Sequence, residues 1–135
     1  MEPFLRPSVL ASGLAVTALL AGCGSDAKPA VCKDVEGLQK TVAGIRDVPL
    51  TQGAGAALKQ YATELRSQLT ALKSDAKAQY ASELAQLDAS VSALSSSVDT
   101  AQATPGAASL AGLATSTKAV GSATKALASA VSSTC

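Results

Sequence analysis

The sequence has no histidine and no tryptophan, and its only aromatic side chains are Phe4, Tyr61 and Tyr80. Without histidine, the chain lacks the commonest general acid–base group at neutral pH and a common metal ligand. The lack of an aromatic platform and of a basic tract argues against nucleic-acid binding. With so few aromatics, the core has to be built from Ala, Val and Leu, which bury little area each.

The remaining polar residues form no recognisable catalytic or cofactor motif. The acidic residues after the N-terminal segment are spread out and mostly flank apolar positions, which is typical of solvated helix faces. They are Asp34, Glu36, Asp47, Glu64, Asp75, Glu83, Asp88 and Asp99. Serine is abundant but has no histidine to complete a triad, and Gly53 and Gly55 lack the lysine and threonine of a phosphate loop. We therefore expect no enzyme activity and no catalytic, cofactor-binding or metal site.

The N-terminal segment has the pattern of a secretion signal. Arg6 precedes an apolar run over residues 9–21, which is too short to span a membrane comfortably. The run ends in Leu20-Ala21-Gly22-Cys23, which resembles the lipobox of bacterial lipoproteins; the resemblance covers residues 1–23. It implies cleavage before Cys23 and acylation of that cysteine, with palmitate-type chains anchoring the protein to the extracytoplasmic face of the cell membrane. An ordinary secretory signal with a chance cysteine, or an uncleaved helix, are the alternatives.

These features divide the chain into a signal peptide (residues 1–22), a lipidated N-terminus with a linker (23–31) and one helical domain (32–135). The linker contains Gly and Pro, and its extended length is only about 25–30 Å. We therefore expect the domain to stay close to the membrane surface.

Two cysteines remain after Cys23 is assigned to the lipid. Cys32 and Cys135 stand at the two ends of the expected domain, and export places them where disulfides persist. A bond between them would close a loop of about 100 residues, worth roughly 4–5 kcal/mol in the chain-entropy picture. Two unpaired thiols or an intermolecular bridge are the alternatives; zinc would need more ligands.

The spacing of apolar residues predicts an all-α, antiparallel, coiled-coil-like bundle. A first helix runs from near Lys33 to near Arg46, and the Pro- and Gly-containing segment 47–55 ends it. Residues 56–103 contain neither Gly nor Pro, which favours one long central helix flanked by two shorter ones. Between Leu69 and Leu84 the apolar steps run 3-4-4-4, so a break near Ser74 that gives a four-helix bundle is the alternative.

The last helix has an apolar seam with a strict alternation of three- and four-residue steps. The seam consists of Leu110, Leu113, Thr117, Val120, Thr124, Leu127 and Val131. Lys118 and Lys125 are seven residues apart and share a face, which is suited to weak attraction of anionic lipid or a wall polymer, although simple solubility is the plainer interpretation. Tyr80 falls on the apolar stripe of the preceding segment and Tyr61 flanks it, so we expect both to pack.

The domain resembles small secreted helical proteins of actinobacteria. In those proteins a cysteine precedes a Val-x-x-Leu-x-x-x-Val helix, here Cys32, Val35, Leu38 and Val42, and a second cysteine, here Cys135, closes the chain. The resemblance spans residues 32–135 and implies no particular activity. We expect a non-catalytic, lipid-anchored envelope protein that binds or spaces a partner through a helical face. A carrier of lipid or of a small hydrophobic ligand is the alternative.

Overall fold

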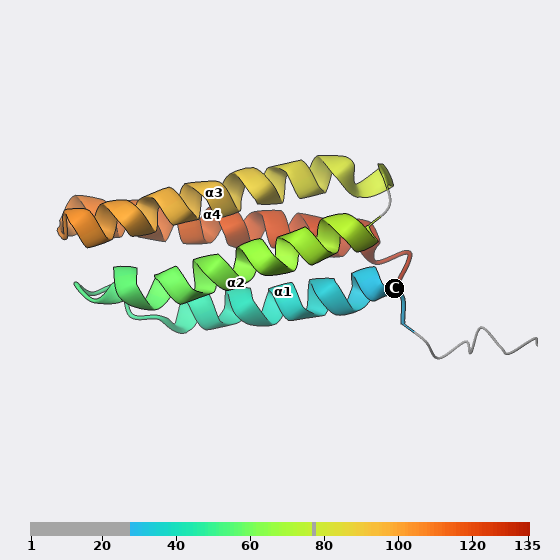
Figure 1. Cartoon of the computed structure of the whole chain (residues 1–135), viewed down its shortest axis with the longest axis horizontal. Coiled ribbons are helices and arrows are strands. Elements are labelled where there is room, and N and C mark those ends of the chain that lie inside the picture. The colour runs from blue at the N-terminus through green and yellow to red at the C-terminus, as the bar shows by residue number, and fades with distance from the viewer. Residues whose placement is uncertain (1–27, 77) are drawn as a thin grey trace, which may run out of the picture.

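A computed structural model describes residues 28–76 and 78–135, and the regular structure in this part of the chain is entirely helical (Figure 1). The α-helices are α1 (Ala30–Asp47), α2 (Ala54–Asp75), α3 (Ala81–Ala103) and α4 (Ala107–Val131), with a 3₁₀ turn, η1 (Ala78–Tyr80), before α3. The all-α prediction is confirmed. The predicted signal peptide, Cys23 and most of the linker lie outside the described residues.

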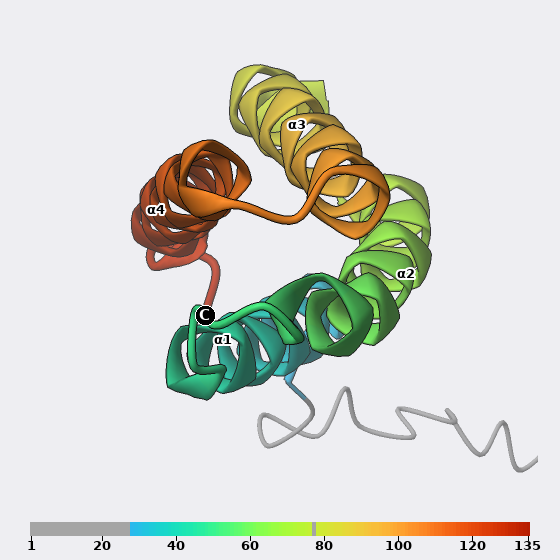
Figure 2. The ribbon, with the colours of Figure 1, turned by 90° about the vertical axis from the view of Figure 1, so that its left-hand side faces the viewer.

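The helices form an antiparallel bundle in which each helix packs against the next along the chain. Figure 2, a view along the bundle, shows α1, α2, α3 and α4 arranged in a ring, and α4 closes the ring by packing against α1. The start of α1 and the end of the chain therefore lie at the same end of the bundle (Figure 1). No helix in the described ranges is both long and apolar enough to cross a membrane.

The single long helix over residues 56–103 is wrong, and the alternative with a break near Ser74 is confirmed. Helix α2 ends at Asp75, Ala76 is extended (φ −81°, ψ 142°), and α3 begins at Ala81. The 4-4-4 steps after Leu72 rotate the apolar stripe around the helix, so one straight helix cannot present all of its leucines to one neighbour. Folding back lets the leucines of α2 and α3 share one interior. The turn could not be located with certainty from the sequence because the segment contains no Gly or Pro.

The interior is filled by the apolar positions that the spacing predicts. Leucines from all four helices are fully buried and form one cluster with the valines and Ile45. The leucines with at most 1% exposure are Leu38, Leu58, Leu65, Leu72, Leu87, Leu94, Leu113 and Leu127. Leu50, in the loop between α1 and α2, is an exception at 41% exposed. The apolar periodicity thus fixes which face of each helix points inward.

A disulfide closes the end of the bundle where the chain enters and leaves. The sulfur atoms of Cys32 and Cys135 lie at bonding distance, and their Cα atoms are 5.7 Å apart, as the sequence predicts. Beside them, the buried Tyr80 hydroxyl forms a hydrogen bond with the Thr134 hydroxyl. The covalent bond and this hydrogen bond fix the last turn of the chain against α1 and η1.

Candidate functional site

The best candidate site is a groove between α1 and α4. Lys118 and Lys125, which the sequence places on one face of α4, flank this groove. A hollow of about 280 Å³ lies between these helices, and another of about 440 Å³ adjoins it; Arg46, Gly121 and Lys125 line both. Lys118 lines the second hollow. We call these two hollows the α1–α4 groove. Its remaining lining residues are Gln39, Val42, Ala43, Thr117, Ser122 and Thr124.

Arg46 joins the two lysines because α1 runs antiparallel to α4. Its guanidinium lies directly over Gly121: a Cβ atom built on that glycine would be only 2.7 Å from Nη2 of Arg46. Any other residue at position 121 would push the guanidinium away from α4. The glycine therefore creates the space in which a charged side chain of α1 rests against the backbone of α4.

Two threonines of the seam have hydroxyls without hydrogen-bond partners. Thr124 is only 3% exposed, and neither its Oγ1 nor that of Thr117 finds a partner in the described chain. Elsewhere threonine hydroxyls in the helices donate to the carbonyl four residues earlier, as Thr70 and Thr115 do. An unpaired buried hydroxyl costs about 1–3 kcal/mol, so this arrangement calls for a partner outside the chain or a compensating role.

The electrostatic character of the groove is positive. Arg46, Lys118 and Lys125 line it, and among the described residues no acidic side chain does. In residues 28–76 and 78–135 none of these three cations forms an ion pair, whereas Lys28 pairs with Glu36 and Lys73 with Asp88. Asp47 follows Arg46 in sequence but does not line either hollow. Three uncompensated cations beside unpaired hydroxyls favour a negatively charged ligand.

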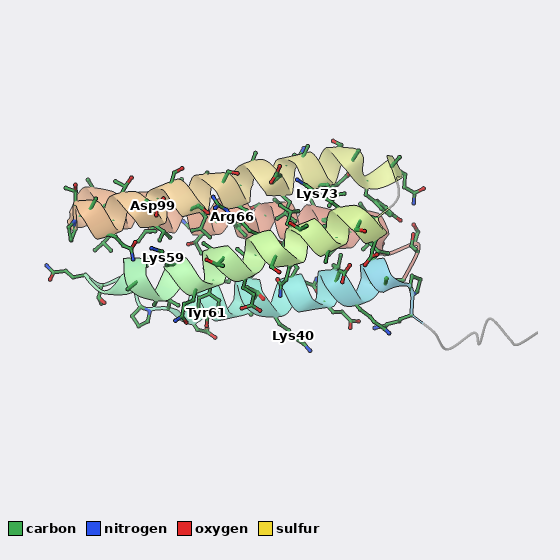
Figure 3. The ribbon with its side chains drawn as sticks, viewed as in Figure 1. Lys40, Lys59, Tyr61, Arg66, Lys73 and Asp99 are labelled. Carbon is green, nitrogen blue, oxygen red and sulfur yellow. A yellow bond between two sulfur atoms is a disulfide. The ribbon has the colours of Figure 1, made fainter. Side chains whose placement is uncertain are left out.

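The two tyrosines pack, as predicted, and lie outside the groove. Tyr80 is 4% exposed and belongs to the core. Tyr61 of α2 packs over Gly44 of α1, where an added Cβ would lie 2.9 Å from its ring (Figure 3). In the same view Lys40 points away from the bundle. The α1–α2 interface is therefore closed by an aromatic ring at the level where the α1–α4 interface is open.

A pair of carboxylates departs from the expectation that all acidic residues sit on solvated faces. Asp34 of α1 is half-buried beside Asp75 at the end of α2, and its Oδ2 has no hydrogen-bond partner among the described atoms. Burial, together with the neighbouring Asp75 carboxylate, raises the pKa of Asp34 above its ordinary value. Within the described ranges no three His, Cys, Asp or Glu side chains gather as metal ligands. The pair is thus a local electrostatic cost rather than a site of its own.

Sequence reasoning found part of the groove and missed the rest. The shared face of Lys118 and Lys125 was visible from their spacing, and so was the position of Thr117 and Thr124 in the seam. The contact between Arg46 and Gly121 could not be predicted from the sequence, because only the antiparallel packing of α1 on α4 brings these residues together. The signal that was available was the predicted Cys32–Cys135 bond, which sets the register between these two helices.

Comparisons with known proteins found no relative of this chain. No protein-family model matches the chain, and no curated protein or solved structure shows significant similarity to it.

Proposed function

We propose that the protein is a non-catalytic, lipid-anchored component of the cell envelope that binds an anionic partner through the α1–α4 groove. The observation that carries this proposal is the alignment of Arg46, Lys118 and Lys125 along a groove that no acidic residue of the described ranges lines. Surface cations are normally interspersed with acids, so such a face attracts negatively charged molecules.

Binding is favoured over catalysis because of the side chains that line the groove. They are arginine, lysines, threonines, a serine, a glutamine and small apolar residues. None is a carboxylate, histidine or cysteine that could act as a general base near neutral pH. The groups are those that hold a charged ligand in place by hydrogen bonds and charge.

The anchor is supported by the lipobox-like sequence, and the helical bundle begins only a few residues after it. Helix α1 begins at Ala30, so residues 23–29 are all that separate it from the proposed lipid on Cys23. Seven residues reach at most roughly 25 Å. At the end of this segment Lys28 pairs with Glu36, on the second turn of α1. The start of the bundle would therefore stay close to the membrane surface.

The carrier alternative lacks a specific supporting observation. The fully buried leucines of all four helices pack into one cluster, and the hollows described above lie at the surface between α1 and α4. A lipid carrier needs an apolar cavity for the chain. We therefore retain only the partner-binding proposal.

Intact-mass analysis of protein extracted from membranes tests the anchor. We expect a species that begins at Cys23 and carries acyl chains, with two hydrogens gained when the Cys32–Cys135 bond is reduced. The variant Cys23→Ser should accumulate as an uncleaved, unacylated precursor. A product that begins beyond Cys23 and is free in the medium would overturn the anchor.

Photo-crosslinking in cells tests the use of the groove. A photoreactive amino acid at Ser122, exposed at the edge of the groove, should give a specific adduct. The same amino acid at Gln60, exposed on α2 away from the groove, is the control. Equal labelling from both positions would contradict binding through the α1–α4 face.

A further inference from the structure

We propose that Arg46, Thr124 and Lys125 together bind a phosphate group in the α1–α4 groove. All three residues line the same hollow of about 280 Å³, on two helices whose relative position the core fixes. The proposal deepens the partner-binding function and rests on it, but it does not depend on the lipid anchor. It names the chemistry of the ligand: a phosphate monoester or diester rather than a neutral or cationic molecule.

The three side chains supply complementary donors. The guanidinium of Arg46 presents a planar fork of N–H groups that matches two phosphate oxygens. The ammonium of Lys125 adds a point charge from the next turn of α4 after Gly121. The Thr124 hydroxyl, which has no partner in the described chain, would donate to a further oxygen after a rotation about χ1 toward the hollow that Thr124 lines.

The buried state of Thr124 is the observation that separates this site from a mere patch of surface charge. Thr124 is 3% exposed and lines the hollow, and its hydroxyl has no partner among the described atoms. A rotation about χ1 would bring this hydroxyl to an oxyanion bound in the hollow, which would supply the missing acceptor. Valine at this position would fill the seam equally well, so the hydroxyl has no packing role that an apolar residue could not serve.

Gly121 determines where the guanidinium rests. Because Nη2 of Arg46 would lie 2.7 Å from an added Cβ, only glycine lets the fork lie against α4 between Thr117 and Thr124. The glycine thus leaves the guanidinium room to lie over the hollow, although the Arg46 side chain as a whole is exposed.

A phosphate fits this arrangement better than a carboxylate. A carboxylate paired with Arg46 keeps both oxygens, and their remaining lone pairs, in the plane of the guanidinium. A phosphate has additional oxygens out of that plane for Thr124 and Lys125. The same chemistry is present in soluble phosphate compounds and in the phosphodiester of an anionic lipid or a wall polymer.

Titration of the purified protein with inorganic phosphate at constant ionic strength tests the site, with backbone amide shifts as the readout. We expect saturable shifts at Gly121, Thr124 and Lys125, and about tenfold weaker binding in Arg46→Gln. The matched control is Lys40→Gln, which removes a cation of α1 that points away from the bundle and should leave the affinity unchanged (Figure 3).

A second pair of variants distinguishes a specific loss of phosphate binding from a loss of folding. Gly121→Ala displaces the guanidinium and should weaken phosphate binding about threefold while the protein stays folded, since alanine favours the helix. Gly112→Ala lies on the same helix with nothing within 4 Å of its Cβ, and it should not change binding.

Two further probes distinguish the sources of phosphate. If glycerophosphoglycerol, the phosphodiester left when phosphatidylglycerol is deacylated, binds as tightly as inorganic phosphate, the ligand is a lipid or polymer diester. If it binds clearly more weakly, the ligand is a free phosphate or a monoester. Acetate that binds as tightly as phosphate, or shifts unchanged in Arg46→Gln, would overturn the proposal. Failure here together with a specific Ser122 adduct would leave partner binding intact and reject only the phosphate chemistry.

Discussion

The two interfaces that α1 makes, with α2 and with α4, are built in opposite ways. Between α1 and α2, the Thr41 hydroxyl accepts a hydrogen bond from Gln68 (2.9 Å) and lies within donating distance of Glu64 (3.2 Å). Between α1 and α4, the middle of the interface is the groove, and the threonine hydroxyls there are unpaired. A covalent bond at one end holds the second interface together.

A glycine faces a long side chain in each interface, with different consequences. Gly44 accommodates the ring of Tyr61, and the contact is closed and mostly apolar. Gly121 accommodates the guanidinium of Arg46, and the contact stays open and charged. The comparison teaches that the α1–α2 interface is sealed at this level by its own side chains. The interface between the two ends of the chain shares the core and has a disulfide at one end, whereas its middle stays open at the surface.

Removal of the disulfide should have the largest effect on this contrast. The double variant Cys32→Ser, Cys135→Ser should lose about 4 kcal/mol of unfolding free energy in urea, because the bond spans 103 residues. Hydrogen exchange should show that amides of α4 beside the groove lose more protection than amides of α2 beside Thr41. Reduction of the wild-type protein is the control and should reproduce the loss. Equal loss of protection at both interfaces would contradict the claim that the two interfaces are built differently.

Paired threonine variants should change stability in opposite directions, by about 1 kcal/mol each. Thr41→Val removes a hydroxyl that accepts from Gln68 and should destabilise the protein. Thr124→Val removes an unpaired buried hydroxyl and should stabilise it, at the cost of phosphate binding. Urea denaturation measures both. If Thr124→Val destabilises the protein as much as Thr41→Val does, the Thr124 hydroxyl already has a partner and the interfaces are alike.

The sequence predicted the outer helices better than the middle of the fold. The apolar steps placed the first helix from near Lys33 to near Arg46, and α1 runs from Ala30 to Asp47. They did not decide whether residues 56–103 turn back, because the turn at Ala76 depends on tertiary packing and carries no Gly or Pro. Local periodicity specifies which face is buried, whereas the choice of neighbour depends on contacts distant in sequence.

The groove illustrates the same limit at the level of single residues. The spacing of Lys118 and Lys125 gave their shared face, since both lie on one helix. Arg46 and Gly121 are 75 positions apart, and their contact exists only once α1 and α4 are antiparallel and in register. The Cys32–Cys135 pairing constrained that register, so a four-helix arrangement combined with it would have brought Arg46 near the middle of α4.

The smallest predicted effect concerns the carboxylate pair at the edge of the α1–α2 interface. The pKa of Asp34 is raised above its ordinary value of 3.8 by burial and by Asp75. Asp34 therefore binds its proton more tightly in the folded protein than in the unfolded chain, and the folded state loses stability as pH rises through that raised pKa. Asp34→Asn removes this penalty, so it should raise Tm by about 2–4 °C at pH 7, equivalent to about 0.5 kcal/mol. The gain should shrink as pH falls and vanish below the ordinary pKa, where the unfolded chain also binds the proton.

Asp99→Asn, exposed on α3, is the control and should show no such pH dependence (Figure 3). A gain in Tm for Asp34→Asn that persists unchanged at pH 3 would show that the substitution acts through packing, and the α1–α2 interface would then carry no electrostatic cost.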